Sequence, residues 1–329
     1  MGCSSLPVEE KLLENKSFKE YKNIATVGKL EPEKIEVQGV LCFFELKNDK
    51  FLVSVGPNKV VIYDKKTFKP MTIIDLNSHC PNYILKLKSG NFLLAADPGK
   101  LFHYSINEEN WTYKELNCFD LKNNITKIIE RNGEIIVSSY KKIYFIDNKF
   151  EDNKLNITKV YEDHLPEIDI FNIFLFNNLL LSCAYGQNDV EEYEIIVYDL
   201  DTNKIVFKEP DASTVPWNQT VCQVNTNVLA ITGNQPGIIL FDMKSFKTLV
   251  EIEDLDFLLS TICLKNKLFC GSASGEIYEF DYKPEANELK FLEKFKIHDD
   301  RIFSITKTSS GELVTISKDG TIKFWTIIN

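Results

Sequence analysis

The sequence predicts an all-β fold built from seven copies of one four-stranded unit, and two observations lead to this prediction. In the last stretch, from His298 to Trp325, three short β-branched and aromatic runs are separated by Ser-Ser-Gly and Lys-Asp-Gly turns, a pattern typical of an antiparallel meander. This unit recurs about every 40–45 residues, which is the period of a propeller blade. A single meander leaves one apolar face in water, so its copies must pack against one another. Seven copies predict a seven-bladed β-propeller.

The copies are recognised by an aromatic or aliphatic residue that ends the third strand and is usually followed by Asp. These residues are Tyr63, Tyr104, Ile146, Tyr198, Phe241, Phe280 and Trp325. Because a catalytic residue is rarely repeated in several blades, the recurring Asp is expected to stabilise a turn. The blades are expected at about residues 40–78, 83–118, 125–162, 171–210, 220–253, 258–297 and 302–328.

The last copy resembles the WD-repeat (WD40) family. His298 falls on the His before the first strand, Thr315 or Ser317 on the second-strand hydroxyl, Asp319 on the turn Asp, and Trp325 on the Trp that names the family. The resemblance implies that these side chains form a buried structural hydrogen-bond network inside the blade. The other six copies lack the Trp and mostly lack the His. The resemblance covers about residues 30–329.

The N-terminal region is expected to contribute a tail and one strand. Residues 1–28 are expected to form a tail with a short helix from Val8 to Tyr21, because Pro7 suits a helix start. The last copy ends at Asn329 without a fourth strand. Residues 34–38 are predicted to supply that strand, so that residues 29–329 form the propeller. A partner-binding role for the helix is the alternative to loose packing.

Composition excludes several classes of function. The chain of 329 residues carries a net charge of −10, and its longest basic runs are Lys65-Lys66 and Lys141-Lys142, so we expect no nucleic-acid partner, which would require a basic patch. A local basic patch on one face of the fold is the alternative. Its eight Cys include no CxxC pair, and no His pair has metal-ligand spacing, so we expect neither metal nor cofactor. Without a signal sequence or a membrane-length apolar run, the chain is expected to be cytoplasmic.

A membrane-anchored alternative rests on the first residues. Gly2 and Cys3 resemble dually acylated N-termini, although Leu6 stands where the myristoylation pattern has Ser or Thr. Acylation of Gly2 and Cys3 would make the protein a lipid-anchored adaptor. An unmodified N-terminal tail is the other interpretation.

The predicted partner-binding face lies on the loops before the first strands. Aromatic and Arg side chains are enriched in binding hot spots, and the candidates here are Tyr83, Phe171, Trp217, Phe257 and Arg301. Packing between blades is the alternative role for Trp217. The surrounding loops hold Asp169, Asp256, Asp299 and Asp300, so the expected partner has a basic surface.

The sequence thus favours a non-enzymatic scaffold or adaptor within a multiprotein complex. No catalytic constellation is recognised, and the many loops of a rigid repeat suit protein binding. The chain is not expected to form a homo-oligomer by itself. A propeller that binds a small ligand or a substrate in its central channel is the remaining alternative, because fold does not fix function.

Overall fold

The computed structural model describes residues 17–27, 42–55, 57–150, 155–163, 168–186, 193–210, 220–233 and 237–327. In these ranges it contains seven antiparallel sheets of four strands each. The predicted fold class, an all-β seven-bladed β-propeller, is confirmed. By internal contacts the chain divides into a terminal unit, Met1–Leu30 with Asn218–Asn329, and a central unit, Glu31–Trp217.

The central unit holds four blades, each with its strands in chain order. Their strands are β2 (Phe43–Leu46), β3 (Lys50–Val55), β4 (Lys59–Asp64) and β5 (Pro70–Asp75); β6 (Cys80–Lys86), β7 (Phe92–Asp97), β8 (Lys100–Asn107) and β9 (Thr112–Asp120); β10 (Ile125–Arg131), β11 (Glu134–Ser139), β12 (Ile143–Asp147) and β13 (Ile157–Tyr161); and β14 (Ile168–Phe176), β15 (Leu179–Gly186), β16 (Tyr193–Asp199) and β17 (Lys204–Pro210).

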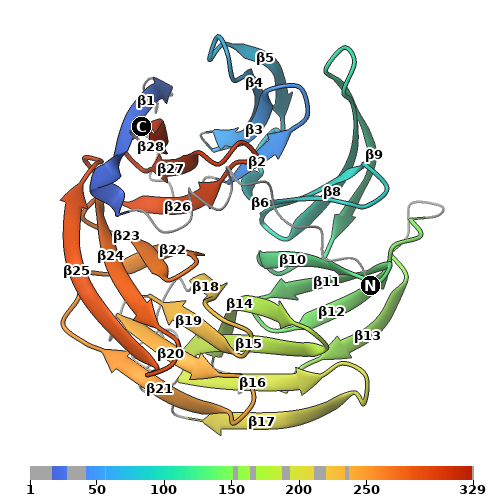
Figure 1. Ribbon diagram of the computed structural model, residues 1–329. Helices are drawn as coiled ribbons and strands as arrows, with labels where there is room; N and C mark the ends of the chain where they lie inside the picture. The colour runs from blue at the N-terminus through green and yellow to red at the C-terminus, as the bar shows by residue number, and fades with distance from the viewer. Residues whose placement is uncertain are drawn as a thin grey trace, which may run out of the picture. The chain divides into compact units, whose positions relative to one another are not determined.

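The terminal unit holds three blades, and the last of them combines three strands from the C-terminal end of the sequence with one from the N-terminal end (Figure 1). Their strands are β18 (Thr220–Gln223), β19 (Val228–Thr232), β20 (Ile238–Asp242) and β21 (Lys247–Ile252); β22 (Leu258–Leu264), β23 (Lys267–Ser272), β24 (Glu276–Lys283) and β25 (Glu288–Lys296); and β26 (Ile302–Lys307), β27 (Leu313–Ser317), β28 (Ile322–Ile327) and β1 (Tyr21–Val27).

The cores lie between neighbouring blades within each unit. Second and third strands are almost wholly buried, as in β7 and β20, because they are covered on both faces and therefore read as continuous apolar runs. Fourth strands are largely exposed, as in β5 and β25. The apolar runs that revealed the repeat are therefore those of the middle strands.

Every blade has a β-bulge at the same place in its fourth strand. The pairing register shifts by one residue opposite the aromatic or aliphatic residue that marks the repeat. The extra residues in the seven fourth strands are Met71, Leu116, Thr158, Val206, Leu249, Leu292 and Ile24. A bulge increases local twist and disfavours pairing of an edge strand with a foreign strand. The β-bulge in the fourth strand is therefore part of the repeated unit.

The fourth strand of the last blade is β1, which is antiparallel to β28 (Figure 1). The prediction that residues 34–38 supply this strand is therefore wrong, and so is the domain boundary at residue 28; residues 34–38 lie outside the described part of the chain. The predicted helix is also wrong at its end, because Tyr21 begins a strand and Phe18–Glu20 forms one 3-10 turn (η1); residues 8–16 of that helix lie outside the described part of the chain. A fourth strand needs few buried residues, so its apolar pattern is weak.

Phe18 and Glu279 hold the start of β1 in place. Phe18 is 3% exposed, and its ring lies 5.3 Å from that of Trp325 and 5.4 Å from that of Phe295. The Glu279 carboxylate is fully buried in β24; its Oε2 accepts hydrogen bonds of 2.8 Å from the Phe18 backbone N–H and from the Ser17 hydroxyl. Lys267 Nζ lies 3.3 Å from Glu279 Oε1. A buried carboxylate requires such partners, so β1 is fixed by an aromatic and a polar anchor together.

Phe18→Ala is expected to destabilise the protein by about 3–5 kcal/mol, because it removes a buried aromatic ring. Hydrogen exchange should accelerate along β1 and β28. Ile24→Ala in the same strand is the matched control, since Ile24 is 46% exposed and exposed substitutions usually change stability by less than about 0.5 kcal/mol. Denaturant melts in which the two variants behave alike would contradict the anchoring role of Phe18.

Candidate functional site

The hydrogen-bond network of the last blade is built around the Thr315 hydroxyl. Trp325 Nε1 in β28 donates to Thr315 Oγ1 over 2.9 Å, and His298 Nε2 lies 2.8 Å from the same oxygen. On its other side, His298 Nδ1 lies 2.9 Å from Asp319 Oδ2 in the turn between β27 and β28. The structure therefore brings together His298, Thr315, Asp319 and Trp325.

Ser317 has a separate role in the same blade. Its hydroxyl donates to the Asp300 carbonyl over 2.9 Å and accepts a hydrogen bond of 3.0 Å from the Asp319 backbone N–H. It thus ties the loop before β26 to the turn after β27 without touching His298 or Trp325. Of the two hydroxyls that the sequence left open, Thr315 is the one that binds both rings.

Asp319 fastens the turn through both carboxylate oxygens. Oδ1 accepts hydrogen bonds from the Thr321 hydroxyl at 2.6 Å and from the Thr321 backbone N–H at 2.9 Å, while Oδ2 accepts one from Asp299 N at 3.0 Å. Burial opposes ionisation of Asp319, but the hydrogen bonds from His298 and Thr321 outweigh it and hold its pKa well below the ordinary range. The ionised carboxylate is therefore part of the folded blade.

The hydrogen bonds of this network connect parts of the last blade to one another. The side chains of His298 and Thr315 are buried, and both ring nitrogens of His298 already have partners. An acid–base pair for catalysis needs a group within reach of substrate, whereas here each polar atom binds another part of the same blade. The network links the residues before β26 with the β27–β28 turn and with β28.

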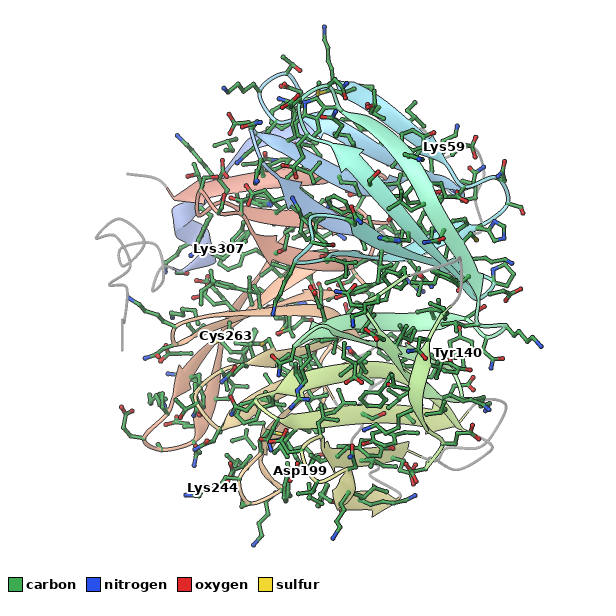
Figure 2. All side chains as sticks on the ribbon, turned by 90° about the vertical axis from the view of Figure 1, so that its right-hand side faces the viewer. Lys59, Tyr140, Asp199, Lys244, Cys263 and Lys307 are labelled. Atoms are coloured by element: carbon green, nitrogen blue, oxygen red, sulfur yellow. The ribbon has the colours of Figure 1, made fainter. Side chains whose placement is uncertain are left out.

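The Asp residues after the third strands form a second repeated feature. Asp64, Asp147, Asp199 (labelled in Figure 2) and Asp242 each accept a hydrogen bond from the backbone N–H two residues on. Such Asx turns fix the hairpin between the third and fourth strands. The predicted turn role is confirmed for these four carboxylates, whereas Asp281, the equivalent residue after Phe280, lies inside β24 and pairs with Lys290 of β25.

The candidate partner-binding residues do not share one position. Phe257 and Arg301 directly precede β22 and β26 and are exposed, Phe257 to 45%. Tyr83 and Phe171 lie inside β6 and β14 and are half-buried, so the prediction that they precede first strands is wrong. Trp217 lies outside the described residues.

The first strands β6 and β14 begin earlier in the sequence than predicted, and a local feature of each strand explains the difference. Pro81 and Asn82 read as a turn, but a first strand is a sheet edge, where Pro is tolerated, and β6 starts at Cys80. The register shifts between Pro81 and Tyr83, so Asn82 is a bulge residue. Phe171 is the bulge residue of β14, and its ring lies 5.9 Å from that of Tyr140 (labelled in Figure 2).

The acidic residues of the candidate face differ in environment. Asp169 is buried, with Lys141 Nζ 2.7 Å from its Oδ1. Asp256 accepts hydrogen bonds from Phe257 N at 2.8 Å and Ser274 N at 2.9 Å. Burial opposes its ionisation, but hydrogen bonds led by those of Ser274 and Ser272 lower its pKa. Asp300 accepts one of 2.8 Å from Arg301 N. Asp256, Asp299 and Asp300 lie beside Phe257 and Arg301 in sequence, and Lys296 is hydrogen-bonded to the neighbouring Ser274 carbonyl.

Other kinds of site have little support in the described ranges. Within them, no group of three or more His, Cys, Asp or Glu side chains is placed to hold a metal ion. None of the helical segments there has the length and apolarity to cross a membrane. Gly2 and Cys3, the possible lipidation residues, lie outside the described residues.

Comparison of this chain with known proteins found similarity among solved structures and none among protein families or curated sequences. No protein-family model and no curated protein sequence matches it. A chain in the crystal structure of the mitotic checkpoint complex matches 100% of this chain and 97% of its own length, with a TM-score of 0.73 and 12% identity. The computationally designed Ika8 protein matches 87% of this chain and 83% of its own, with a TM-score of 0.61 and 13% identity. At these identities the similarities support the propeller fold and nothing finer.

Sequence reasoning missed Glu279 and Phe18. A signal for Glu279 was present, because an acidic residue stands between Tyr278 and Phe280 inside a third strand whose neighbours are buried. A carboxylate at such a position needs a partner. The partner, however, comes from a segment about 260 residues away in sequence, and no local pattern identifies it.

Thr315→Val is expected to destabilise the protein by about 1–3 kcal/mol, because the isosteric change leaves the buried Trp325 N–H and His298 ring nitrogen without a partner. Thr306→Val in β26 is the matched control, since Thr306 is half-buried outside this network. The two free energies of unfolding would be compared in urea. Equal effects would show that the Thr315 hydroxyl does not hold the network.

Asp319→Asn is expected to lose stability at pH 7 and to approach wild type in acid. A carboxyl whose pKa is lowered by folding stabilises the fold above its unfolded pKa, here 3.8, and loses this contribution as pH falls below that value. The melting-temperature difference between wild type and variant should therefore shrink below about pH 4. If the difference in melting temperature between wild type and Asp319→Asn stays constant from pH 7 to pH 3, the ionised state assigned to Asp319 is wrong.

Proposed function

We propose that this chain is a non-enzymatic, WD40-repeat protein-interaction scaffold that acts as an adaptor within a multiprotein complex. The proposal includes a cytoplasmic location, no cofactor and no nucleic-acid partner. The observation that carries it is the pair Phe257 and Arg301, an exposed aromatic and an exposed Arg side chain at equivalent positions before the first strands of neighbouring blades.

The backbone at these two residues is hydrogen-bonded to its own blade. The Phe257 carbonyl accepts a hydrogen bond of 2.7 Å from Ala273 N, and the Arg301 carbonyl accepts one of 2.9 Å from Lys318 N. The two donors stand at the same place, directly after the second strand of their blades. Side chains presented on a fixed backbone lose less entropy on binding. This favours a preformed interaction surface.

Charge favours a basic partner. Asp256, Asp299 and Asp300 surround Phe257 and Arg301 in sequence, and the hydrogen bonds of Asp256 favour its charged form. The chain as a whole has a net charge of −10, which also disfavours self-association. We therefore propose a partner that presents Lys or Arg, with no homo-oligomer formed by the chain alone.

Phe257→Ala and Arg301→Ala are expected to remove the partner from affinity-purified material while leaving the melting temperature unchanged. Hot-spot truncation costs about 2 kcal/mol or more of binding free energy, which corresponds to roughly thirtyfold weaker affinity. Wild-type binding should also weaken as salt rises.

Tyr113→Ala and Lys290→Ala are the matched controls. Tyr113 is a 41% exposed aromatic residue in β9, and Lys290 is an exposed cation in β25. These variants should retain the wild-type partners. If Phe257→Ala and Arg301→Ala remain folded and co-purify the same proteins as the controls, this surface is not the partner site.

A further inference from the structure

Four different polar side chains occupy one register position of the central unit, three of them within first strands and the fourth, Cys42, directly before β2. Cys42, Tyr83, Lys127 and Asn172 occupy it in successive blades, since each lies opposite the equivalent residue of its second strand. These opposite residues are Ser54, Ala95, Ser138 and Cys183. The repeat therefore places a thiol, a phenol, an amine and an amide in consecutive blades.

Lys127 and Tyr83 are in contact within this row. Lys127 Nζ lies 5.5 Å from the centroid of the Tyr83 ring, a distance at which a cation and an aromatic face attract each other. Both side chains are half-buried, so they are partly desolvated and still open to solvent. Burial lowers the pKa of Lys127 to about 8 and is also the main reason that the pKa of Tyr83 rises to about 12.

The Lys127 amine has no anionic partner in the described part of the chain. No hydrogen bond or ion pair to a described residue is formed by its Nζ, and no neighbouring charge contributes to its pKa shift. Lys86 in β6, by contrast, pairs with Glu108, and Lys141 beyond β11 pairs with Asp169. Nearby Thr126 and Ser138 bond each other at 2.8 Å. A partly buried ammonium is ordinarily paired with an anion.

We propose that Lys127 and Tyr83 form a binding site for an oxyanion, the carboxylate or phosphate group of a ligand that reaches the first strands of the central unit. The ammonium supplies charge and up to three N–H donors, and the phenol supplies one O–H donor. An oxyanion is the ligand that accepts from both, and its hydrogen bonds to a charged donor are about twice as strong as neutral ones. This site uses residues other than Phe257 and Arg301 and does not rest on the proposed scaffold function.

The test follows lysine side chains in the full-length protein by NMR, with ¹³Cε-labelled lysine. Lys127→Met assigns the Lys127 signal, and inorganic phosphate and N-acetylglutamate are the two probes. Either probe is expected to shift the Lys127 signal saturably and to raise its apparent pKa from about 8, because an anion favours the charged amine. A response to phosphate alone identifies a phosphate site, and a response to both identifies a general oxyanion site. The paired Lys86 signal is the internal control.

Variants separate binding from folding. Tyr83→Phe should weaken binding about fivefold to tenfold, since one hydrogen bond contributes about 1 kcal/mol. Lys127→Arg keeps the charge and should retain binding, followed through the Tyr83 ring signals, whereas Lys127→Met should abolish it. The proposal is overturned if neither probe shifts the Lys127 signal saturably, or if the signal moves only at probe concentrations that also move Lys86.

Discussion

The pairing of β1 with β28 is the constraint on which the last blade depends. Without β1, β28 would be an open sheet edge bearing unpaired backbone groups, and this strand contains the buried Trp325. The same indole takes part in two assemblies: its Nε1 donates to Thr315, and its ring packs 5.3 Å from that of Phe18. The hydrogen-bond network and the N-terminal anchor therefore share one side chain. We infer that the most complete repeat is also the one that must hold a strand from the opposite end of the chain.

Glu279 extends this coupling to the neighbouring blade. Its carboxylate is buried in β24 and binds the Phe18 N–H and the Ser17 hydroxyl. Removing the N-terminal segment would leave this charge with Lys267 at 3.3 Å as its remaining described partner. A buried charge that loses partners is strongly destabilising. The polar contact thus adds a penalty for detaching β1 that aromatic packing alone would not impose.

The sequence predicts the repeat well because middle strands are covered on both faces and must be apolar throughout. It also predicts the turn Asp residues, since an Asx turn needs a specific side chain at a specific place. It misplaces the fourth strand of the last blade, because an exposed edge strand such as β1 requires few buried residues and its partner is far away in sequence. It misplaces the starts of β6 and β14 because bulges at Asn82 and Phe171 break the alternation.

The sites differ in how far local sequence determines them. The network of His298, Thr315, Asp319 and Trp325 lies within one blade, so its spacing is visible in one stretch of chain. The contact of Tyr83 with Lys127 joins two blades, and neither residue lies in a recognisable motif. It becomes visible only when strand register aligns the first strands of successive blades. In a repeat protein, the residues that all copies share determine the backbone. Side chains that differ between copies at an equivalent position are therefore candidates for binding. Lys127 meets this criterion most clearly among the four, because its charge has no partner in the described residues.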